Sequence, residues 1–161
     1  MFRRATYADA GEIAIIYNQA MKPGVFAMSP IAPDNQEERV AWLSEHQDPY
    51  PAFVYEIDNK VIGWCSLSRF SVRPEYTDVA ETSRYIDESH RGKGLGKLML
   101  AHLIETAANL GFRLLVSTVY ERNVRSIRSA DVFFRRAAML HEVARIHGEW
   151  HNIVWVSQKL R

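Results

Sequence analysis

A glycine-rich stretch with several cations, ESHRGKGLGKLML at residues 88–100, stands directly before an apolar run with helical spacing. Glycine lets the backbone approach a ligand without side-chain obstruction, and the helix that follows points unpaired N–H groups at the same spot. Free amides at a helix N-terminus favour anions, phosphate groups in particular. The pattern Arg-x-x-Gly-x-Gly, which starts at Arg91, therefore predicts a pyrophosphate-binding turn. On this stretch alone, a glycine-rich loop with solvated cations stays open as the alternative.

Two familiar phosphate motifs do not match this stretch. A P-loop has Gly-Lys followed by Ser or Thr, but here Gly96-Lys97 is followed by Leu98. A dinucleotide fingerprint has its third glycine three residues after the second, where this chain has Lys97, and it opens an early βαβ unit. The sequence therefore supports neither nucleotide fold.

The composition is that of an ordinary globular domain. The 161 residues are 47% hydrophobic and 24% charged, so we expect a single domain, residues 1–161, with a sizeable core. No apolar run is long enough to span a bilayer, and MFRRATYADA has no apolar signal-peptide region, which favours a cytoplasmic location without a membrane partner. A net charge of +1 argues against a nucleic-acid partner, because such domains usually carry a marked basic excess.

Neither cysteine nor histidine indicates a metal site. Cys65 is the single cysteine, which excludes an internal disulfide and a multi-cysteine zinc site, and its alternating surroundings predict a packed residue rather than a nucleophile. His141, His147 and His151 gather near the C-terminus, but no carboxylate or cysteine completes a ligand set. We interpret these histidines as edge residues of a final hairpin and expect no metal.

Hydrophobic periodicity and turn residues predict a mixed α/β fold. Thr6 and Asn123 are candidate caps at helix starts, Asp58-Asn59-Lys60 is a hairpin signal, and Gly111 stops the helix after the glycine-rich stretch. The expected order is helix 6–21, loop 22–33, helix 35–45, two antiparallel strands within 52–70, strand 80–88, helix 94–110, strand 113–119, helix 123–136, and strands 141–146 and 152–159.

Taken in this order, the chain resembles the GNAT N-acetyltransferase superfamily, and more closely its phosphinothricin acetyltransferase-like branch. The stretches that carry the resemblance run nearly end to end: IIYNQAM, RVAWL, VIGWCSLSRF, AETSRYIDESHRGKGLGKLML, LGFRLLVSTVYERNVRSI and HGEWHNIVW. The resemblance implies a mixed, mostly antiparallel sheet flanked by helices, with a splayed central strand pair. It also implies acetyl transfer from acetyl-CoA to the amine of a small molecule, such as an amino acid or an analogue like phosphinothricin or methionine sulfoximine.

The resemblance assigns cofactor contacts by position. Backbone amides of the glycine-rich stretch would cradle the pyrophosphate of acetyl-CoA, and the exposed main chain of the strand before it would pair with the pantetheine arm. Asn123, which opens an Asn-x-x-Ser pattern, would bond the same arm, although an N-cap role accounts for it equally well. The implied cofactor-binding residues are Arg84, Tyr85, Ile86, Arg91, Gly92, Lys93, Gly94, Leu95, Gly96, Lys97, Asn123 and Ser126.

The implied chemistry is direct acyl transfer from a thioester to an amine, without a protein nucleophile. The amine must be neutral to attack, and backbone N–H donors can stabilise the negative charge that develops on the thioester oxygen. Glu81 matches the Glu of the branch that faces the substrate, and it is the expected base, directly or through water. Without the resemblance, a solvated strand carboxylate would be the simpler interpretation.

The segment SADVFFRR departs from the branch. There the branch has a His or Tyr as candidate proton donor to the departing thiolate, followed by a glycine, whereas this chain is one residue shorter and has Ala130 near that position. Ser129 and Asp131 are the nearest polar groups, and neither is equivalent. The general acid is therefore unassigned. The thiolate of coenzyme A can leave without one at reduced rate, because a thiol has a pKa of about 8.5.

Substrate contacts are assigned less directly. The loop RFSVRPEY has Ser71 where the branch has an arginine that grips a substrate carboxylate, so Arg73 is the replacement candidate. Phe26 and Trp64 are candidate pocket walls, with core packing as the alternative. The branch commonly forms dimers, which implies a homodimer. Two other functions stay open: an acyl-CoA-binding protein with weak turnover, and an acetyltransferase for protein or peptide amines.

Overall fold

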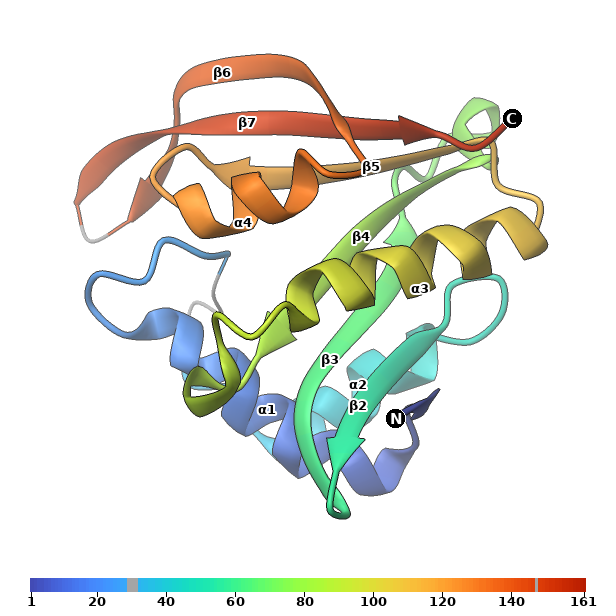
Figure 1. Cartoon of the computed structure of the whole chain (residues 1–161), viewed down its shortest axis with the longest axis vertical. Coiled ribbons are helices and arrows are strands. Elements are labelled where there is room, and N and C mark those ends of the chain that lie inside the picture. The colour runs from blue at the N-terminus through green and yellow to red at the C-terminus, as the bar shows by residue number, and fades with distance from the viewer. Residues whose placement is uncertain (29–31, 147) are drawn as a thin grey trace.

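The computed structural model describes residues 1–28, 32–146 and 148–161, and its strands form one seven-stranded sheet (Figure 1). The strand order is β1-β2-β3-β4-β5-β7-β6, and among the described strands only β4 and β5 pair in parallel. The strands are β1 (Phe2–Arg4), β2 (Ala52–Ile57), β3 (Lys60–Arg69), β4 (Val79–Ile86), β5 (Leu114–Tyr120), β6 (Arg135–Ile146) and β7 (Glu149–Lys159). The predicted mixed, mostly antiparallel sheet is therefore confirmed.

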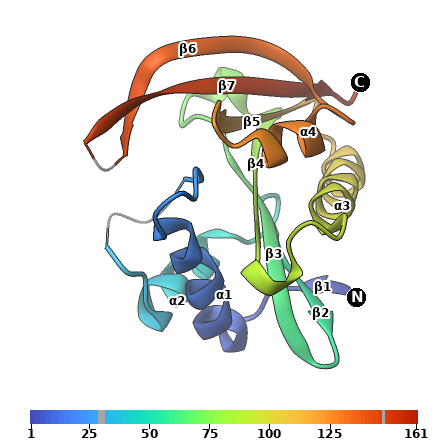
Figure 2. The same ribbon diagram turned by 60° about the vertical axis from the view of Figure 1, so that its left-hand side comes forward.

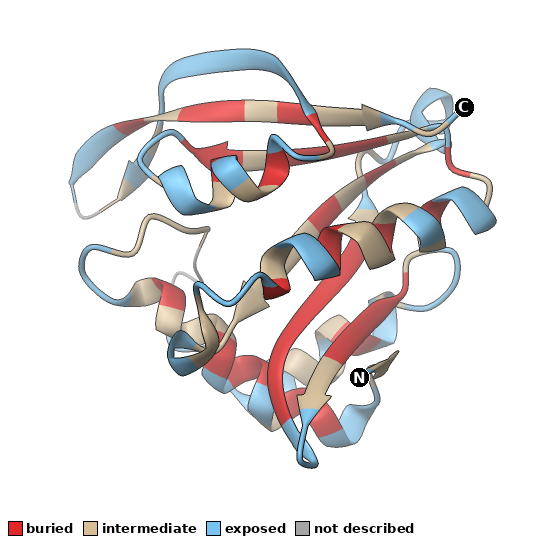
Figure 3. Cartoon of the chain, in the orientation of Figure 1, coloured by how far each residue is buried: buried red, intermediate tan, exposed pale blue. Residues whose placement is uncertain are grey.

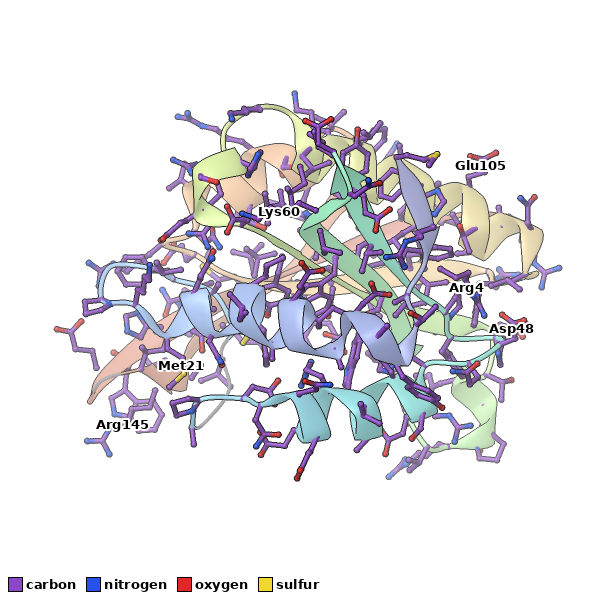
Figure 4. All side chains as sticks on the ribbon, turned by 90° about the horizontal axis from the view of Figure 1, so that it is seen from below. Arg4, Met21, Asp48, Lys60, Glu105 and Arg145 are labelled. Carbon is purple, nitrogen blue, oxygen red and sulfur yellow. The ribbon has the colours of Figure 1, made fainter. Side chains whose placement is uncertain are left out.

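Helices cover both faces of this sheet (Figure 2). Helices α1 (Ala10–Asn18) and α2 (Gln36–Glu45) lie on one face, and α3 (Leu95–Asn109) and α4 (Val124–Ala130) lie on the other. Short 3₁₀ turns link several elements, at Tyr7–Asp9, Gln19–Met21, Pro74–Tyr76 and Glu88–His90. The view from below shows α1 and α2 side by side, with Arg4 next to Asp48 near one end of this layer (Figure 4), where Arg4 Nη2 lies 3.0 Å from Asp48 Oδ1.

Each face of the sheet has its own hydrophobic core, and burial runs along the central strands (Figure 3). The core under α1 and α2 contains Ile13, Leu43, Val54 and Trp64. The larger core on the other face has the α3 residues Leu95, Met99, Leu100, Leu103 and Ala107 at its centre. Their spacing of three and four residues places them on one stripe of the helix, which is the stripe that faces the sheet.

The β2–β3 hairpin follows the turn chemistry that the sequence predicts. Asp58 and Asn59 have φ angles of 50° and 62°, so both residues occupy the left-handed region. Two-residue hairpin turns of this kind match the twist of the flanking strands, and short polar side chains tolerate the conformation better than others do.

The central strands β4 and β5 pair for only part of their length. Their parallel register covers residues 79–81 of β4 against 114–116 of β5, although both strands continue beyond these pairs. At the point where they part, Ser117 Oγ donates to Thr82 O at 3.2 Å. The predicted splay is thus confirmed, and it leaves one edge of β4 without a strand partner from residue 82 onward.

Helix α3 begins and ends at glycines with positive φ. Gly94 is its N-cap with a φ of 86°, and Gly111, just past its end, has a φ of 85°. A residue with a Cβ pays a steric penalty in this region, which glycine avoids. The predicted start and stop of this helix are therefore confirmed.

The C-terminal third differs from the prediction in element lengths. Helix α4 ends at Ala130 rather than near residue 136, because the chain turns at residues 131–133 and enters β6 at Arg135. Phe134, which was expected within the helix, is buried at the turn with 4% exposure. Strand β6 begins earlier than expected, and β1 was not expected at all, since three residues are too short for a periodic signal.

The interpretation of the C-terminal histidines needs one correction. His141 lies on the edge strand β6 and is exposed, as expected, and His147 lies outside the described residues. His151 lies on β7, which is flanked by two strands, and it is buried beside the rings of Phe26 and Tyr120. Among the described residues, no three His, Cys, Asp or Glu side chains gather as a metal site would require. Every helix within that part of the chain is too short or too polar to cross a bilayer.

Candidate functional site

A cavity of about 680 Å³ lies beside the free end of β4, where the glycine loop (residues 91–96), α4 and the loop after α1 meet. Its volume is in the range of small-molecule and cofactor sites. The lining residues are 20, 24–27, 84–86, 91, 92, 94–97, 122–126, 128 and 129.

The lining is strongly cationic. It includes six Lys and Arg side chains and no Asp or Glu, although the whole chain has a net charge of only +1. Sequence reasoning named some of these cations but missed three, Arg122 just before α4 and Arg125 and Arg128 within it. The spacing of three residues between Arg125 and Arg128 was the available signal, because it brings two side chains to one face of a helix. A polyanionic ligand suits this lining.

The backbone of the glycine loop offers a row of free donors. The amides of residues 92–96 have no acceptor among the described residues, which makes them available to an anion. The two outer amides of the predicted cradle are already engaged: Arg91 N donates to Glu88 O at 3.4 Å, and Lys97 N donates to Gly94 O at 3.0 Å. The structure therefore narrows the predicted amide cradle from residues 91–97 to residues 92–96.

The side chains of this loop have different surroundings. Arg91 anchors the loop, because its Nε donates to Ile86 O at 2.9 Å and its Nη2 donates to Gln19 Oε1 at 3.2 Å. Lys97 lines the cavity, whereas Lys93 lies in a separate, smaller hollow beside Tyr55 and is exposed. The predicted role of Lys93 as a cation of the same site is therefore not supported by its position.

Asp87 ties the end of β4 to the loop. Its carboxylate accepts hydrogen bonds from Ser89 and, at 2.8 Å, from Gln19 Nε2. These bonds, with a further one from His90, hold the pKa of Asp87 far below its usual range. A carboxylate held as an anion by three neighbours is a firm anchor for the turn that precedes the free amides.

The free edge of β4 presents main-chain groups from alternate residues. Asp87 N donates to Ile62 O of β3 at 2.9 Å. Because main-chain groups alternate in direction along a strand, the N–H and C=O groups of Tyr85 also point to β3, whereas those of Arg84 and Ile86 point to the gap beside β5. Of the three residues predicted to offer main-chain contacts, Arg84 and Ile86 fit, and Tyr85 does not. Tyr85 instead donates from its hydroxyl to Met28 O at 2.6 Å.

Comparison with known proteins decides the family. The sequence profile described as the Acetyltransferase (GNAT) family matches residues 16–131, well over half of the chain. The chain belongs to this family. It is 30% identical to YwnH of Bacillus subtilis (strain 168) over 162 residues, 98% of each protein. It is also 29% identical to the L-methionine sulfoximine/L-methionine sulfone acetyltransferase of Salmonella typhimurium, over 98% of this chain and 93% of that relative.

Solved structures of the GNAT family agree with the fold. A phosphinothricin acetyltransferase from Sinorhizobium meliloti, solved in complex with AcCoA, superposes with a TM-score of 0.90 at 26% identity and covers 99% of this chain and 88% of its own. The chain is thus a GNAT acetyltransferase with acetyl-CoA as its acyl donor, as the resemblance implied. Free amides, six cations and an unpaired strand edge fit a ligand that combines a diphosphate with an amide-containing arm.

Glu81 of this acetyltransferase lies away from the cavity. Its side chain alternates with Arg84 to opposite faces of β4, and it is absent from the cavity lining. Thr118 Oγ1 of β5 donates to Glu81 Oε1 at 3.2 Å, across the point where the two strands still lie close. Burial raises the pKa of Glu81, and the bond from Thr118 opposes this shift. A carboxylate with a raised pKa is suited to accept a proton near neutral pH.

The three predicted substrate residues are not brought together. Phe26 lines the cavity, with the guanidinium of Arg122 4.2 Å from its ring centroid. Trp64 is 2% exposed and stacks on the Tyr85 ring at 4.6 Å, so it belongs to the core and the prediction of a pocket wall is wrong. Arg73 is exposed in the turn after β3, outside the cavity lining.

Helix α4 presents its N-cap and a buried alanine. Asn123 Oδ1 accepts a hydrogen bond from Ser126 N at 3.1 Å, so the N-cap interpretation holds for its oxygen, while the residue also lines the cavity. Ala130 is 1% exposed and has no proton to donate. Asp131 forms an ion pair with Arg136 at 2.9 Å, and Ser129 lines the cavity.

Proposed function

We propose that this GNAT enzyme acetylates the amine of a small molecule, either an amino acid or an analogue of the methionine sulfoximine and phosphinothricin type. The observation that carries the proposal is the conjunction of five free amides with a cationic cavity beside the unpaired edge of β4. The acceptor class is supported by the activity for which the Salmonella typhimurium relative is named.

In this proposal the free amides of residues 92–96 hold the diphosphate, and Lys97 and the α4 arginines balance its charge. The main-chain groups of Arg84 and Ile86, together with Asn123 Nδ2 and Ser126, contact the pantetheine arm. Bound acetyl-CoA supplies an activated acetyl group in the form of a thioester. Support comes from the position of all these groups around one cavity.

We assign the base to Glu81, which takes a proton from the attacking amine directly or through water. Its half-buried position and raised pKa support this role, since an ammonium group must lose a proton before it attacks. Glu81 and the glycine loop lie on different parts of β4, so the acceptor would approach from the face of the sheet that carries α1 and α2. For the acceptor, Phe26 remains a proposed contact because it lines the cavity.

The chain would act as one acetyltransferase domain over residues 1–161, and a cytoplasmic location stays a prediction. We further propose a homodimer. Support for it comes from apolar side chains exposed on the last two strands, Met139, Leu140 and Val143 of the edge strand β6 and Trp150 of β7, whose burial would be favourable. A monomer at micromolar concentration in sedimentation equilibrium would contradict this part of the proposal.

Release of thiol from acetyl-CoA tests the activity directly. Purified protein is incubated with acetyl-CoA and a panel that contains methionine sulfoximine, phosphinothricin and free amino acids, with an N-terminal peptide as the competing acceptor. We expect amine-dependent thiol release with at least one small acceptor and a thermal shift on addition of acetyl-CoA alone.

Two outcomes contradict the proposal in different ways. A thermal shift without thiol release from any amine would indicate an acyl-CoA-binding protein with weak turnover, the alternative that the missing donor at Ala130 suggests. Release with the peptide and with no small amine would indicate a protein acetyltransferase instead.

A further inference from the structure

The guanidinium of Arg84 spans the gap between β4 and α4 at the cavity wall. Its Nη2 donates to Ser126 O at 3.2 Å and to Ser126 Oγ at 3.1 Å. Its Nε and Nη1 form no hydrogen bond with any described residue, and no carboxylate in that part of the chain pairs with it. Arg84 therefore presents unused N–H donors and an uncompensated positive charge to the cavity that it lines.

This charge has little to balance it from any neighbouring element. Burial lowers the pKa of Arg84 to about 10, so the group stays cationic at neutral pH. The titratable groups nearest to it are Cys65, opposite on β3, and the adjacent Tyr85, and burial raises the pKa of both, which keeps them neutral. Arg84 is half-buried at the cavity wall and has no counter-ion, so an anionic group bound in the cavity would be stabilised beside it.

A second polar group is buried without a partner at the same place. Ser129 Oγ of α4 makes no hydrogen bond with any described residue and is shielded from solvent. A Cβ atom placed on Gly96 would lie 3.2 Å from Ser129 Oγ and 3.8 Å from Arg84 Nε. Strand β4, the first turn of α3 and α4 thus converge around Gly96, with donors from two of them unpaired.

The guanidinium contacts the face of α4 that carries Ala130. Ser126 and Ala130 are four residues apart, so they lie on one face of the helix. Ala130 stands near the position where the resembling branch has its candidate proton donor, and an alanine has nothing to give a departing thiolate. Arg84 is bonded to this face one turn before Ala130, which itself packs into the core, so the cation stands at the turn of α4 that precedes the missing donor.

We propose that Arg84 is a further catalytic residue, whose guanidinium stabilises the coenzyme A thiolate as it departs, in place of a proton donor. This inference rests on the proposed function. The amine nitrogen forms a C–N bond with the acetyl carbon, the C–S bond breaks, and its electron pair leaves on sulfur. The amine proton goes to Glu81 or water, and Arg84 keeps its own protons. The thiolate takes up a proton from solvent after release.

The test measures the ionisation of bound coenzyme A rather than turnover. A cation beside the sulfur lowers the thiol pKa, so free coenzyme A should bind more tightly as pH rises, whereas acetyl-CoA has no thiol and serves as the internal control. Dissociation constants of both ligands are measured by titration calorimetry at pH 6.5 and 9.5. If binding lowers the thiol pKa by one unit, the affinity ratio of coenzyme A to acetyl-CoA rises about eightfold over this interval.

Three variants separate this role from simple binding. Arg84→Met should leave the affinity ratio flat with pH, and Arg84→Lys should restore part of the rise. Arg125→Met removes another cavity cation, so it should weaken both ligands alike and preserve the wild-type rise. In turnover, Arg84→Met should lower kcat by about 10²-fold with little change in KM for acetyl-CoA.

Each outcome decides the matter. A flat ratio in the wild-type protein overturns the inference, and so does an unchanged rise in Arg84→Met or a defect confined to KM. If Arg84→Met fails to fold, the wild-type ratio and Arg84→Lys carry the test. Failure to bind either ligand would contradict the proposed function instead, which distinguishes the two failures.

Discussion

Two charged residues of β4, Glu81 and Arg84, lie three positions apart and therefore on opposite faces of the strand. At a strand rise of roughly 3.3 Å per residue, their Cα atoms are about 10 Å apart. One face offers a carboxylate with a raised pKa, and the other offers a cation without a counter-ion. An acyl group held in the gap beside the free edge of β4 would have a proton acceptor on one side of the sheet and a stabiliser for its leaving group on the other side.

The residue-scale prediction concerns Glu81→Gln. Only the ionised carboxylate accepts a proton, so kcat/KM of the wild-type enzyme should rise with pH through the raised pKa of Glu81 and be lost below it. The variant should lose about 10²-fold in kcat and lose this acid limb, while its affinity for acetyl-CoA stays unchanged. Pre-steady-state and steady-state thiol release across pH 5 to 9 measure both effects.

A matched variant, Thr118→Val, removes the hydrogen bond that opposes the shift and keeps the side-chain shape. It should move the acid limb to higher pH without abolishing it. If Glu81→Gln retains the wild-type rate, another group or water acts as the base.

At the scale of elements, the glycine loop and the first turn of α3 form the most specialised part of the chain. Gly92 and Gly94 have φ angles of 82° and 86°, and the free amides of residues 92–96 depend on this path of the backbone. The anchors are side chains from elsewhere, since Arg91 and Asp87 both bond to Gln19 beyond the end of α1. The glycine motif and the tertiary contacts of Arg91 and Asp87 are both needed to orient the free amides toward the cavity.

The element-scale prediction compares two glycines of the same helix. Gly94 and Gly111 both have positive φ and open space around a Cβ, but only Gly94 lines the cavity. Gly94→Ala and Gly111→Ala should each lower the free energy of unfolding by about 1 kcal/mol, because alanine is strained in this region. Only Gly94→Ala should also weaken acetyl-CoA binding, since its strain is relieved by moving the free amides.

Denaturant unfolding and calorimetric titration of both variants measure this difference. Equal affinity for acetyl-CoA in the two variants would show that the amides of the loop do not hold the cofactor.

At the scale of the whole molecule, one sheet separates two cores that are built from different helices. The N-terminal side is tied together by charge as well as by packing. Arg3 of β1 donates to Asp9 Oδ1 at 2.6 Å and to Glu56 Oε1 of β2 at 2.5 Å, and the Asp9 side chain is only 5% exposed. This network joins the start of the chain to α1 and to the sheet.

The whole-molecule prediction is that Asp9 contributes stability that depends on pH. Burial alone would raise the pKa of Asp9, but hydrogen bonds from Arg3 and Thr6 outweigh it and lower the pKa. A carboxyl whose folded pKa is depressed stabilises the fold above its unfolded pKa of about 3.9 and loses that contribution as pH falls through the folded value. Asp9→Asn should therefore cost about 2 kcal/mol at pH 7 and progressively less as the pH is lowered toward 3.

Urea unfolding at several pH values measures this cost. Asp48→Asn is the matched control, because the Asp48 carboxylate pairs with Arg4 at the surface, where it is 70% exposed, and its loss should cost less than about 0.5 kcal/mol. An Asp9→Asn cost that does not change with pH would show that packing, and not charge, explains the loss.

Much of the candidate site could be predicted from the residues alone, and the failures share a cause. The glycine loop and the Asn123 cap follow from local rules, and the splayed strand pair is what the resemblance to the family implies. From the sequence, Trp64 is a candidate pocket wall, with core packing as the alternative, because an alternating strand does not reveal which of its faces meets solvent. Arg122, just before α4, and Arg125 and Arg128 within it were missed because cations on a short helix are common and the sequence does not show that a cavity lies beside them.

The sequence by itself determined the order of the elements other than β1, the turn glycines and the family, because these depend on contacts between near neighbours and on motifs that follow one another along the chain. Only the tertiary structure decided which amides are free, which face of β4 carries each charge, and that Arg84 of β4 reaches Ser126 of α4. The physical reason is that the effect of a charged side chain depends on the groups that pair with it, and these groups are distant in sequence. No local rule states whether such partners are present.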